Sequence, residues 1–232
     1  MSHRDDTAEF DEYASSYDIA LNNGLRLTGE TAEYYLQRRV EWMHYRLRHQ
    51  HLPPIRRVLD FGCGLGRSAP VLRDAFGAQE VVGLDESPNM VSQAHRDHPW
   101  ATFALTTELK NLGAFDLVYC NGVFHHIAPE KRLATLTAIR SCLSQHGAFA
   151  LWENNPYNPA TRFVMSRVSF DRDANLLSAM TSRKLLRKAN FRIRQTDYLF
   201  LFPALLKRLR PIEQHLVSWP LGGQYLILAH RT

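Results

Sequence analysis

The feature that most constrains this chain is a short apolar run leading directly into three closely spaced glycines, Val58-Leu-Asp-Phe-Gly-Cys-Gly-Leu-Gly66. Glycine lacks a Cβ atom, so the backbone here can turn sharply and lie against a ligand. A strand that enters such a turn, followed by a helix, is typical of nucleotide-binding α/β folds. The stretch therefore predicts a parallel sheet with a ligand site at the carboxyl end of its first strand.

Helix and strand patterns alternate after this turn. Ser87 and Pro88 mark one helix start, as cap and first-turn residue. Several strand candidates are continuously apolar, as strands covered on both faces should be. In order, the expected elements are a helix at 68–76, strands at 80–85, 101–105 and 115–123, a helix at 129–143 and a strand at 147–153. We expect an α/β fold with a Rossmann-like, doubly wound, mostly parallel sheet of seven strands.

The flanks of this core have different patterns. Helical patterning over 7–19 and 28–49 ends at Pro53-Pro54. Two strand-like runs near the C-terminus flank a helix near 203–215 and predict an antiparallel C-terminal edge strand. The chain is thus interpreted as one domain with four parts: an N-terminal helical cap (1–54), a core (55–153), a small lid insertion at the acceptor side (154–190) and a C-terminal strand pair (191–232).

Composition limits the class of protein. A chain of 232 residues that is 45% hydrophobic can bury one full core. Its three cysteines are scattered without metal-ligand or disulfide spacing, which favours a reducing, cytoplasmic setting and predicts no metal. The N-terminus is unlike a signal peptide, and no apolar run approaches the roughly 18 residues that span a bilayer. Nothing here indicates an oligomeric state.

Charge is unevenly distributed. The formal net charge is +5, and residues 162–210 contain twelve basic residues against three acidic ones. Such a segment attracts phosphate, carboxylate, nucleic acid or a membrane surface, or it is simply a solvated face.

Two carboxylates distinguish the ligand of the glycine turn. Asp60 precedes the first glycine by two residues, where it would repel a pyrophosphate but suits a ligand with an α-amino group. Asp85 ends the next strand, 19 residues after Gly66, where a carboxylate accepts hydrogen bonds from both ribose hydroxyls. The glycine spacing also differs from the Gly-x-Gly-x-x-Gly of dinucleotide binders. Together these features indicate a cationic nucleoside, S-adenosylmethionine.

The segment from Val58 to about Glu153 resembles the class I S-adenosylmethionine-dependent methyltransferases of small molecules. The motifs that carry the resemblance are "VLDFGCGLG", "VVGLDESPNMV" and "FDLVYCNGVFHHI". The family usually has an Asp after the third strand for the adenine amine, but this chain has "LTTEL", which leaves that contact open. The resemblance implies a cofactor site formed by Asp60, Gly62, Cys63, Gly64, Gly66, Asp85, Glu86, Met90, Thr106, Thr107, Asn121 and Gly122, closed by the N-terminal Tyr17.

A second motif is misleading. Asn154-Asn155-Pro156-Tyr157 is similar to the Asn-Pro-Pro-Tyr signature of enzymes that methylate amide or adenine nitrogens. That signature follows the fourth strand, whereas this stretch follows the fifth. Aromatic–basic nucleic-acid recognition modules are also missing. We therefore expect no nucleic-acid partner.

Residues at the carboxyl ends of the fourth and fifth strands are the candidates for acceptor chemistry. His126, slightly preferred over His125, is a candidate base because histidine accepts protons near neutral pH. Glu153 would orient or stabilise that imidazole. Asn155, Tyr157 and Arg162 are candidate acceptor-binding residues, since guanidinium pairs with anionic groups.

These observations predict transfer of a methyl group to an oxygen of a small polar acceptor, such as a sugar, a carboxylic acid or a secondary metabolite, including anionic ones. The alternatives are an N-methyltransferase, an enzyme acting on a lipid-linked acceptor at the membrane surface, and a non-catalytic S-adenosylmethionine-binding protein. The apolar and basic residues of "LFLFPALLKRLRPIEQHL" fit peripheral membrane contact, although core packing explains them too.

Overall fold

The computed structural model describes residues 24–50, 52–168 and 174–231. Seven strands form one sheet in the order β3-β2-β1-β4-β5-β7-β6. The strands are β1 (Arg57–Phe61), β2 (Glu80–Asp85), β3 (Thr102–Leu105), β4 (Phe115–Asn121), β5 (Leu143–Asn154), β6 (Phe191–Leu199) and β7 (Gln224–Arg231). The helices are α3 (Ala32–Arg48), α4 (Ser68–Phe76), α5 (Pro88–Asp97), α6 (Arg132–Ser141), α7 (Pro159–Met165), α8 (Ala179–Lys188) and α9 (Arg210–Leu216), with short 3₁₀ helices η1 (Arg26–Thr28), η2 (Thr106–Asn111) and η4 (Ala204–Leu209).

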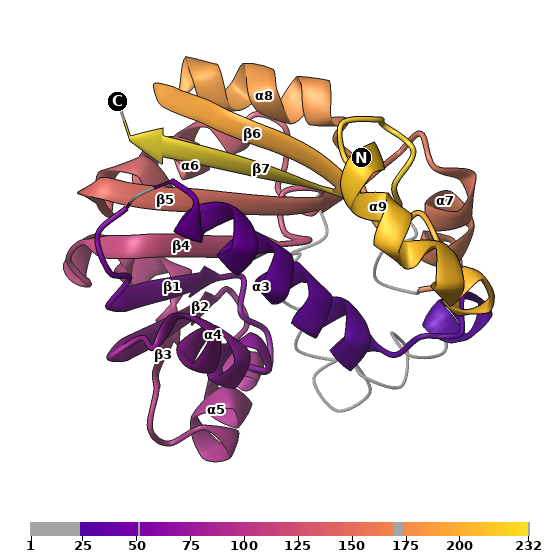
Figure 1. The fold of residues 1–232 in the computed structure, drawn as a ribbon. Coiled ribbons are helices and arrows are strands. Elements are labelled where there is room, and N and C mark those ends of the chain that lie inside the picture. Colours follow the sequence, from indigo (N-terminus) through magenta and orange to yellow (C-terminus); the bar gives the residue numbers. More distant parts are fainter. Residues whose placement is uncertain (1–23, 51, 169–173, 232) are drawn as a thin grey trace, which may run out of the picture.

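Helices cover both faces of the sheet, as Figure 1 shows. Alternate residues of a strand point to opposite faces, so Val58 belongs to the apolar layer that contains residues of α3 and α4, and Leu59 to the layer that contains residues of α6 and α8. The two apolar layers explain why the central strands are continuously hydrophobic in sequence. The doubly wound sheet predicted from the sequence is confirmed.

The C-terminal strand pair closes one edge of the sheet. β7 runs antiparallel to both β5 and β6 and lies between them, so the outermost strand of this edge is β6. Inserting β7 beside β5 brings Gln224 opposite Asn154, and Glu153 opposite Tyr225. Side chains from the start of β7 therefore lie beside those at the carboxyl end of β5.

Local signals set most element boundaries. Ser87 accepts a hydrogen bond from the Met90 amide at the start of α5, as its sequence predicted. The helix expected from Pro129 begins instead at Arg132, whose buried guanidinium donates to the carbonyls of Ile127 and Asn175. The preceding residues form a turn, in which the Lys131 amide donates to the Ala128 carbonyl (2.9 Å).

The region expected to be a lid contains two helices. Asn158 caps α7 through the Thr161 amide, and Pro159 occupies its first turn, the same signal that starts α5. α8 packs its Leu186 into the main core. The second half of region 154–190 is therefore part of the layer that covers the sheet. The four-part division of the chain remains an interpretation.

Candidate active site

The three glycines of the turn after β1 have different functions in the structure. All have left-handed backbone, with φ of 78° at Gly62, 52° at Gly64 and 72° at Gly66. A Cβ on Gly62 would lie 2.2 Å from the Val123 side chain, and one on Gly66 2.8 Å from the Phe103 ring. At Gly64, by contrast, no atom of the described residues lies within 4 Å of such a Cβ. Gly62 and Gly66 are thus required by packing, whereas Gly64 keeps space open beside the backbone.

That open space belongs to a cavity of about 680 Å³. Its volume lies in the range of sites that bind small molecules and cofactors. One half of its wall follows the carboxyl ends of β1, β2 and β4, where a doubly wound sheet binds ligands. This half contains Gly62, Gly64, Asp85, Glu86, Met90, Thr106, Thr107, Asn121 and Gly122.

The Asp85 carboxylate organises this half. Its Oδ2 accepts a hydrogen bond from the Gly64 amide (2.8 Å), and its Oδ1 accepts one from the Ser87 amide (3.0 Å). One side chain thus fixes the glycine turn to the start of α5. These contacts hold a carboxylate at the cavity wall, at the strand end where the sequence placed it.

Asp60 and Cys63 lie behind the wall, outside the residues that line the cavity. Asp60 is 2% exposed and accepts a hydrogen bond from the Ser68 hydroxyl. Burial, together with the charge of Asp85, raises the pKa of its carboxyl to about 7, against the opposing effects of the Ser68 hydrogen bond and the charge of Arg39. Burial also raises the pKa of the Cys63 thiol well above its usual value, so this cysteine is a packed, protonated side chain.

Arg39 is a cavity residue that the sequence analysis missed. It lies on the buried face of α3 and donates from Nε to the Tyr119 hydroxyl (3.3 Å) and from Nη1 to Gln224 Oε1 (3.1 Å). It also lines the cavity. Its position among Leu36, Val40 and Met43, on the apolar stripe of the helix, was the available signal.

His125 and Glu153 form a buried pair. His125 Nδ1 lies 2.6 Å from Glu153 Oε2, and Glu153 Oε1 accepts a hydrogen bond from the Phe124 amide (2.7 Å). The two side chains are 2% and 0% exposed. His125 also lines the cavity. Glu153 thus pairs with His125, and not with His126, which the sequence analysis preferred. His126 also lines the cavity, with its ring centroid 4.2 Å from that of His125.

The other half of the cavity is largely apolar. It is lined by aromatic and aliphatic side chains from α3, from α7 and from the segment after β6, namely Tyr34, Tyr35, Phe163, Val164, Phe200 and Phe202. Polar side chains enter from the end of β5, from the N-cap and first turn of α7, and from β7: Asn154, Asn158, Thr161 and Gln224. This half can hold a molecule with an apolar body and a few polar substituents.

The three acceptor-binding residues predicted after β5 do not reach the cavity. Asn155 is 1% exposed, and its Nδ2 donates to the carbonyls of Pro220 and Gly222, so it joins two loops. Tyr157 is 68% exposed. Arg162 is exposed on the outer face of α7, because the short helix turns Thr161 and Val164 inward. Tyr17 lies outside the described residues.

The basic segment points mainly to solvent. Arg167 stacks on the Phe163 ring (4.8 Å), and Arg183 donates to Thr196 at the surface of the sheet edge. Within the described ranges, no group of three or more His, Cys, Asp or Glu side chains is arranged to hold a metal ion. No helix in this part of the chain has both the length and the apolar character needed to cross a bilayer.

A glycine turn and a carboxylate at the carboxyl edge of a sheet with the strand order β3-β2-β1-β4-β5-β7-β6 are the arrangement of the class I methyltransferase fold. Comparison with known proteins agrees. Residues 58–147 match the family model described as a methyltransferase domain. They therefore form a methyltransferase domain of the class I, S-adenosylmethionine-dependent type.

Similar proteins have diverse names. The chain is 43% identical over 86 residues to ribosomal protein L11 methyltransferase of Ralstonia pickettii, covering 35% of this chain and 26% of that protein. It is 32% identical over 117 residues to trans-aconitate 2-methyltransferase of Variovorax paradoxus, covering 49% and 44%. The matches thus span less than half the length of these relatives. Magnesium protoporphyrin IX methyltransferase of Synechocystis, solved with S-adenosylhomocysteine, shares the fold at a TM-score of 0.62 and 20% identity, over 98% of this chain and 100% of that one.

Proposed function

We propose that this protein transfers a methyl group from S-adenosylmethionine to a hydroxyl oxygen of a small acceptor. The observation that carries the proposal is the buried His125–Glu153 pair, whose imidazole lines the same cavity as the glycine turn and Asp85. A cavity with a cofactor half and a base in its wall is suited to proton removal and methyl transfer in one place.

The residues of the first half fit the cofactor. The Asp85 carboxylate would accept the ribose hydroxyls, and Glu86, Met90, Thr106 and Thr107 would border the adenine. The open space beside Gly64 accommodates the ligand against the backbone. Arg39 would pair with the methionine carboxylate, and Asn121 and Gly122 would lie below the sulfonium. Asp60, behind the wall, would support the glycine turn through its hydrogen bond with Ser68. Bound here, the cofactor supplies an electrophilic methyl carbon.

The pair formed by His125 and Glu153 would remove the acceptor's proton. With its Nδ1–H donated to Glu153, the His125 imidazole carries its lone pair on Nε2. Nε2 would accept the hydroxyl proton as the oxygen attacks the methyl carbon, and Glu153 would stabilise the resulting imidazolium. The Phe124 amide holds the second carboxylate oxygen, so Glu153 cannot rotate away without losing a buried hydrogen bond.

The lining of the second half favours an acceptor with an apolar or aromatic body. Tyr35 and Phe200 meet edge to face with their centroids 4.8 Å apart and form one wall, and Phe163 and Phe202 extend it. Arg162 and Arg167 are exposed and do not line the cavity, so they provide no site for an acceptor with several anionic groups.

The test is formation of S-adenosylhomocysteine with a panel of phenols, hydroxylated aromatic acids, sugars and amines. We expect turnover with a phenolic or other acidic hydroxyl. His125→Ala should lower kcat for that acceptor about 10²- to 10⁴-fold, the usual contribution of a general base. His126→Ala is the matched control and should retain most of the activity and the same affinity for S-adenosylhomocysteine. Equal losses in both variants, or turnover of amines alone, would refute the assignment.

Methylation of a carboxylate oxygen is a second candidate, because several similar proteins are named trans-aconitate 2-methyltransferase. Lys131 at the cavity wall could pair with such an acceptor. A carboxylate is already ionised at neutral pH and has no proton to lose. His125→Ala would then leave kcat nearly unchanged, and this outcome separates the two candidates.

A further inference from the structure

One end of the molecule has an unusual concentration of exposed apolar side chains. Of the twelve large hydrophobic residues exposed in the described chain, eight belong to α7 and its flank or to the segment 205–221. These eight form what we call the apolar rim: Tyr157, Phe163, Leu205, Leu206, Leu209, Ile212, Trp219 and Leu221. Leu205 is 92% exposed. Single exposed hydrophobic residues are ordinary, but a cluster of eight marks a surface with a partner.

The two segments of the apolar rim are joined by hydrogen bonds. Asn158 Nδ2 donates to the Leu221 carbonyl (2.7 Å), and the Thr161 hydroxyl donates to the Gly223 carbonyl (2.8 Å). Asn155 donates to the carbonyls of Pro220 and Gly222. Figure 1 shows α7 and α9 at the same end of the molecule, beyond the ends of β5 and β7. The two groups of side chains are therefore held in a fixed relation.

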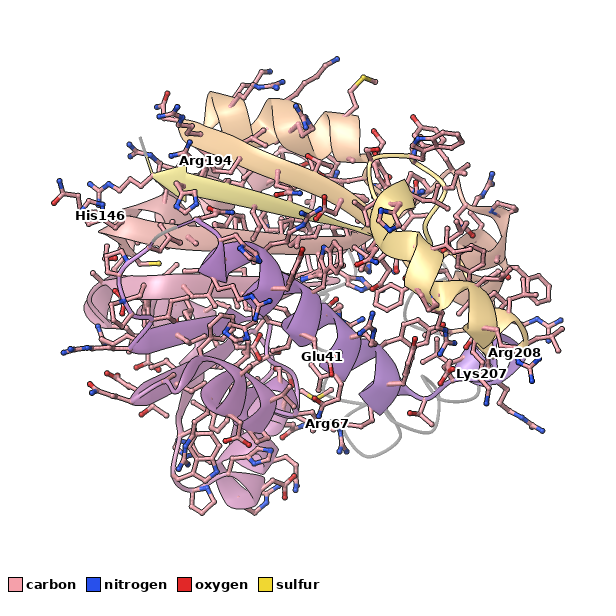
Figure 2. All side chains as sticks on the ribbon, in the orientation of Figure 1. Glu41, Arg67, His146, Arg194, Lys207 and Arg208 are labelled. Carbon is pink, nitrogen blue, oxygen red and sulfur yellow. The ribbon has the colours of Figure 1, made fainter. Side chains whose placement is uncertain are left out.

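The charge beside the apolar rim is positive. Lys207 and Arg208 are exposed, and neither forms an ion pair with another residue of the described ranges. Arg210 pairs with Glu30 (2.6 Å), and Glu213 is buried with its carboxylate on the Leu201 amide. Figure 2 shows Lys207 and Arg208 extending from this end, far from Arg194 at the opposite end. Two uncompensated cations thus border the most exposed leucine.

We infer that the apolar rim docks on the surface of an anionic lipid bilayer. Interleaved leucines and a tryptophan beside exposed lysine and arginine are the combination that binds the headgroup region, by apolar insertion and by attraction to anionic lipid. α9 has only seven residues, so the rim lies on the membrane surface and does not enter deeply. A purely apolar protein partner would not need the two cations.

The rim also borders the cavity. Phe163 is 46% exposed and lines the cavity as well. Residues 200–203, which line the cavity, lead directly into η4 and Leu205. Docking would therefore place the apolar half of the cavity beside the bilayer, where an acceptor dissolved in the membrane could enter. The docking itself does not depend on the proposed methyl transfer.

Sedimentation with lipid vesicles tests the inference, in the absence of cofactor and acceptor. We expect binding to phosphatidylcholine vesicles that contain phosphatidylglycerol, weaker binding to phosphatidylcholine alone, and weakening by salt. The double substitution Lys207→Gln/Arg208→Gln should weaken binding about 25-fold, at about fivefold for each cation near an anionic surface. Arg192→Gln/Arg194→Gln on β6 removes the same charge from another surface and should have little effect.

A second pair of variants tests the apolar component. Leu205→Ser/Ile212→Ser should reduce binding to both kinds of vesicle, while Leu133→Ser on α6, which is also exposed at 39%, should not. Unchanged thermal unfolding and S-adenosylhomocysteine binding would show that these variants are folded. The inference is overturned by no sedimentation with anionic vesicles, by equal losses in the β6 control, or by a dimer that only the rim variants dissociate.

Discussion

Gly64 and Gly77 allow a direct test of the cofactor half of the cavity. Both have left-handed backbone, with φ of 52° and 60°, and at both an added Cβ would have no atom of the described residues within 4 Å. Only Gly64 lines the cavity; Gly77 ends α4 at the surface. Alanine at either position therefore has the same backbone cost, but only alanine at Gly64 occupies the ligand's space.

The expected magnitudes follow from these positions. Left-handed backbone costs a residue with a Cβ about 1–2 kcal/mol, so each variant should lose about that much of its free energy of unfolding. For a chain of this size the melting temperature should fall by about 2–8 °C. A methyl group forced against a closely packed ligand costs about 1–3 kcal/mol. Gly64→Ala should therefore raise the Kd for S-adenosylhomocysteine about 5- to 150-fold, and Gly77→Ala should leave it unchanged.

Calorimetric titration with S-adenosylhomocysteine and thermal unfolding measure both quantities without any knowledge of the acceptor. Equal Kd values for the wild type and Gly64→Ala would mean that the ligand does not lie against the turn. Equal losses of affinity in both variants would mean that global destabilisation, and not occupied space, causes the effect.

Three further predictions concern buried carboxylates. Glu153→Gln should lower kcat with a hydroxyl acceptor about 10²- to 10³-fold at unchanged Kd for S-adenosylhomocysteine, because an amide N–H facing His125 favours the wrong tautomer; a kcat within about threefold of wild type would contradict this. Asp60 has its pKa raised from 3.8 to about 7, so it stabilises the fold when protonated and this contribution is lost as pH rises through that interval. Urea unfolding should show that the wild type loses up to about 4 kcal/mol of unfolding free energy between pH 3.8 and about 7, and that Asp60→Asn does not lose it. Parallel curves of unfolding free energy against pH for the two proteins would refute this prediction. Asp197, 2% exposed, joins β6 to α3 through Arg46 (2.7 Å), and Asp197→Ala should cost about 3–5 kcal/mol of unfolding free energy in urea; a cost below about 1 kcal/mol would show that the contact is not stabilising.

The cofactor side of the site could largely be predicted from the sequence because its parts are local. The glycine turn, the carboxylate of Asp85 and the Ser87 cap lie within thirty residues of one another, and each follows from the strand or helix next to it. Parallel strands then bring these turns to one edge of the sheet by topology alone. The positions of Asp85 and Glu86 at the cavity wall agree with that reasoning.

The acceptor side required the tertiary structure. His125 and His126 are adjacent and chemically identical, and only the turn after β4, whose Phe124 amide donates to Glu153, decides which one meets that carboxylate. Asn155 is a residue type that often binds ligands, but its side-chain amide donates to the carbonyls of Pro220 and Gly222 in the loop before β7. A shift of one residue along a turn or strand reverses the direction of a side chain, and residue type does not reveal it.

The sequence by itself thus determined the fold class and the half of the cavity built from consecutive strand–turn–helix units. The tertiary structure alone decided the rest of the cavity wall, to which Arg39 of α3, Phe163 of α7 and Phe200 after β6 contribute from positions far apart in the sequence. The physical reason is the range of the forces involved. Backbone turns and caps are set by neighbouring residues, whereas burial and contact across the cavity depend on how distant helices pack on the finished sheet.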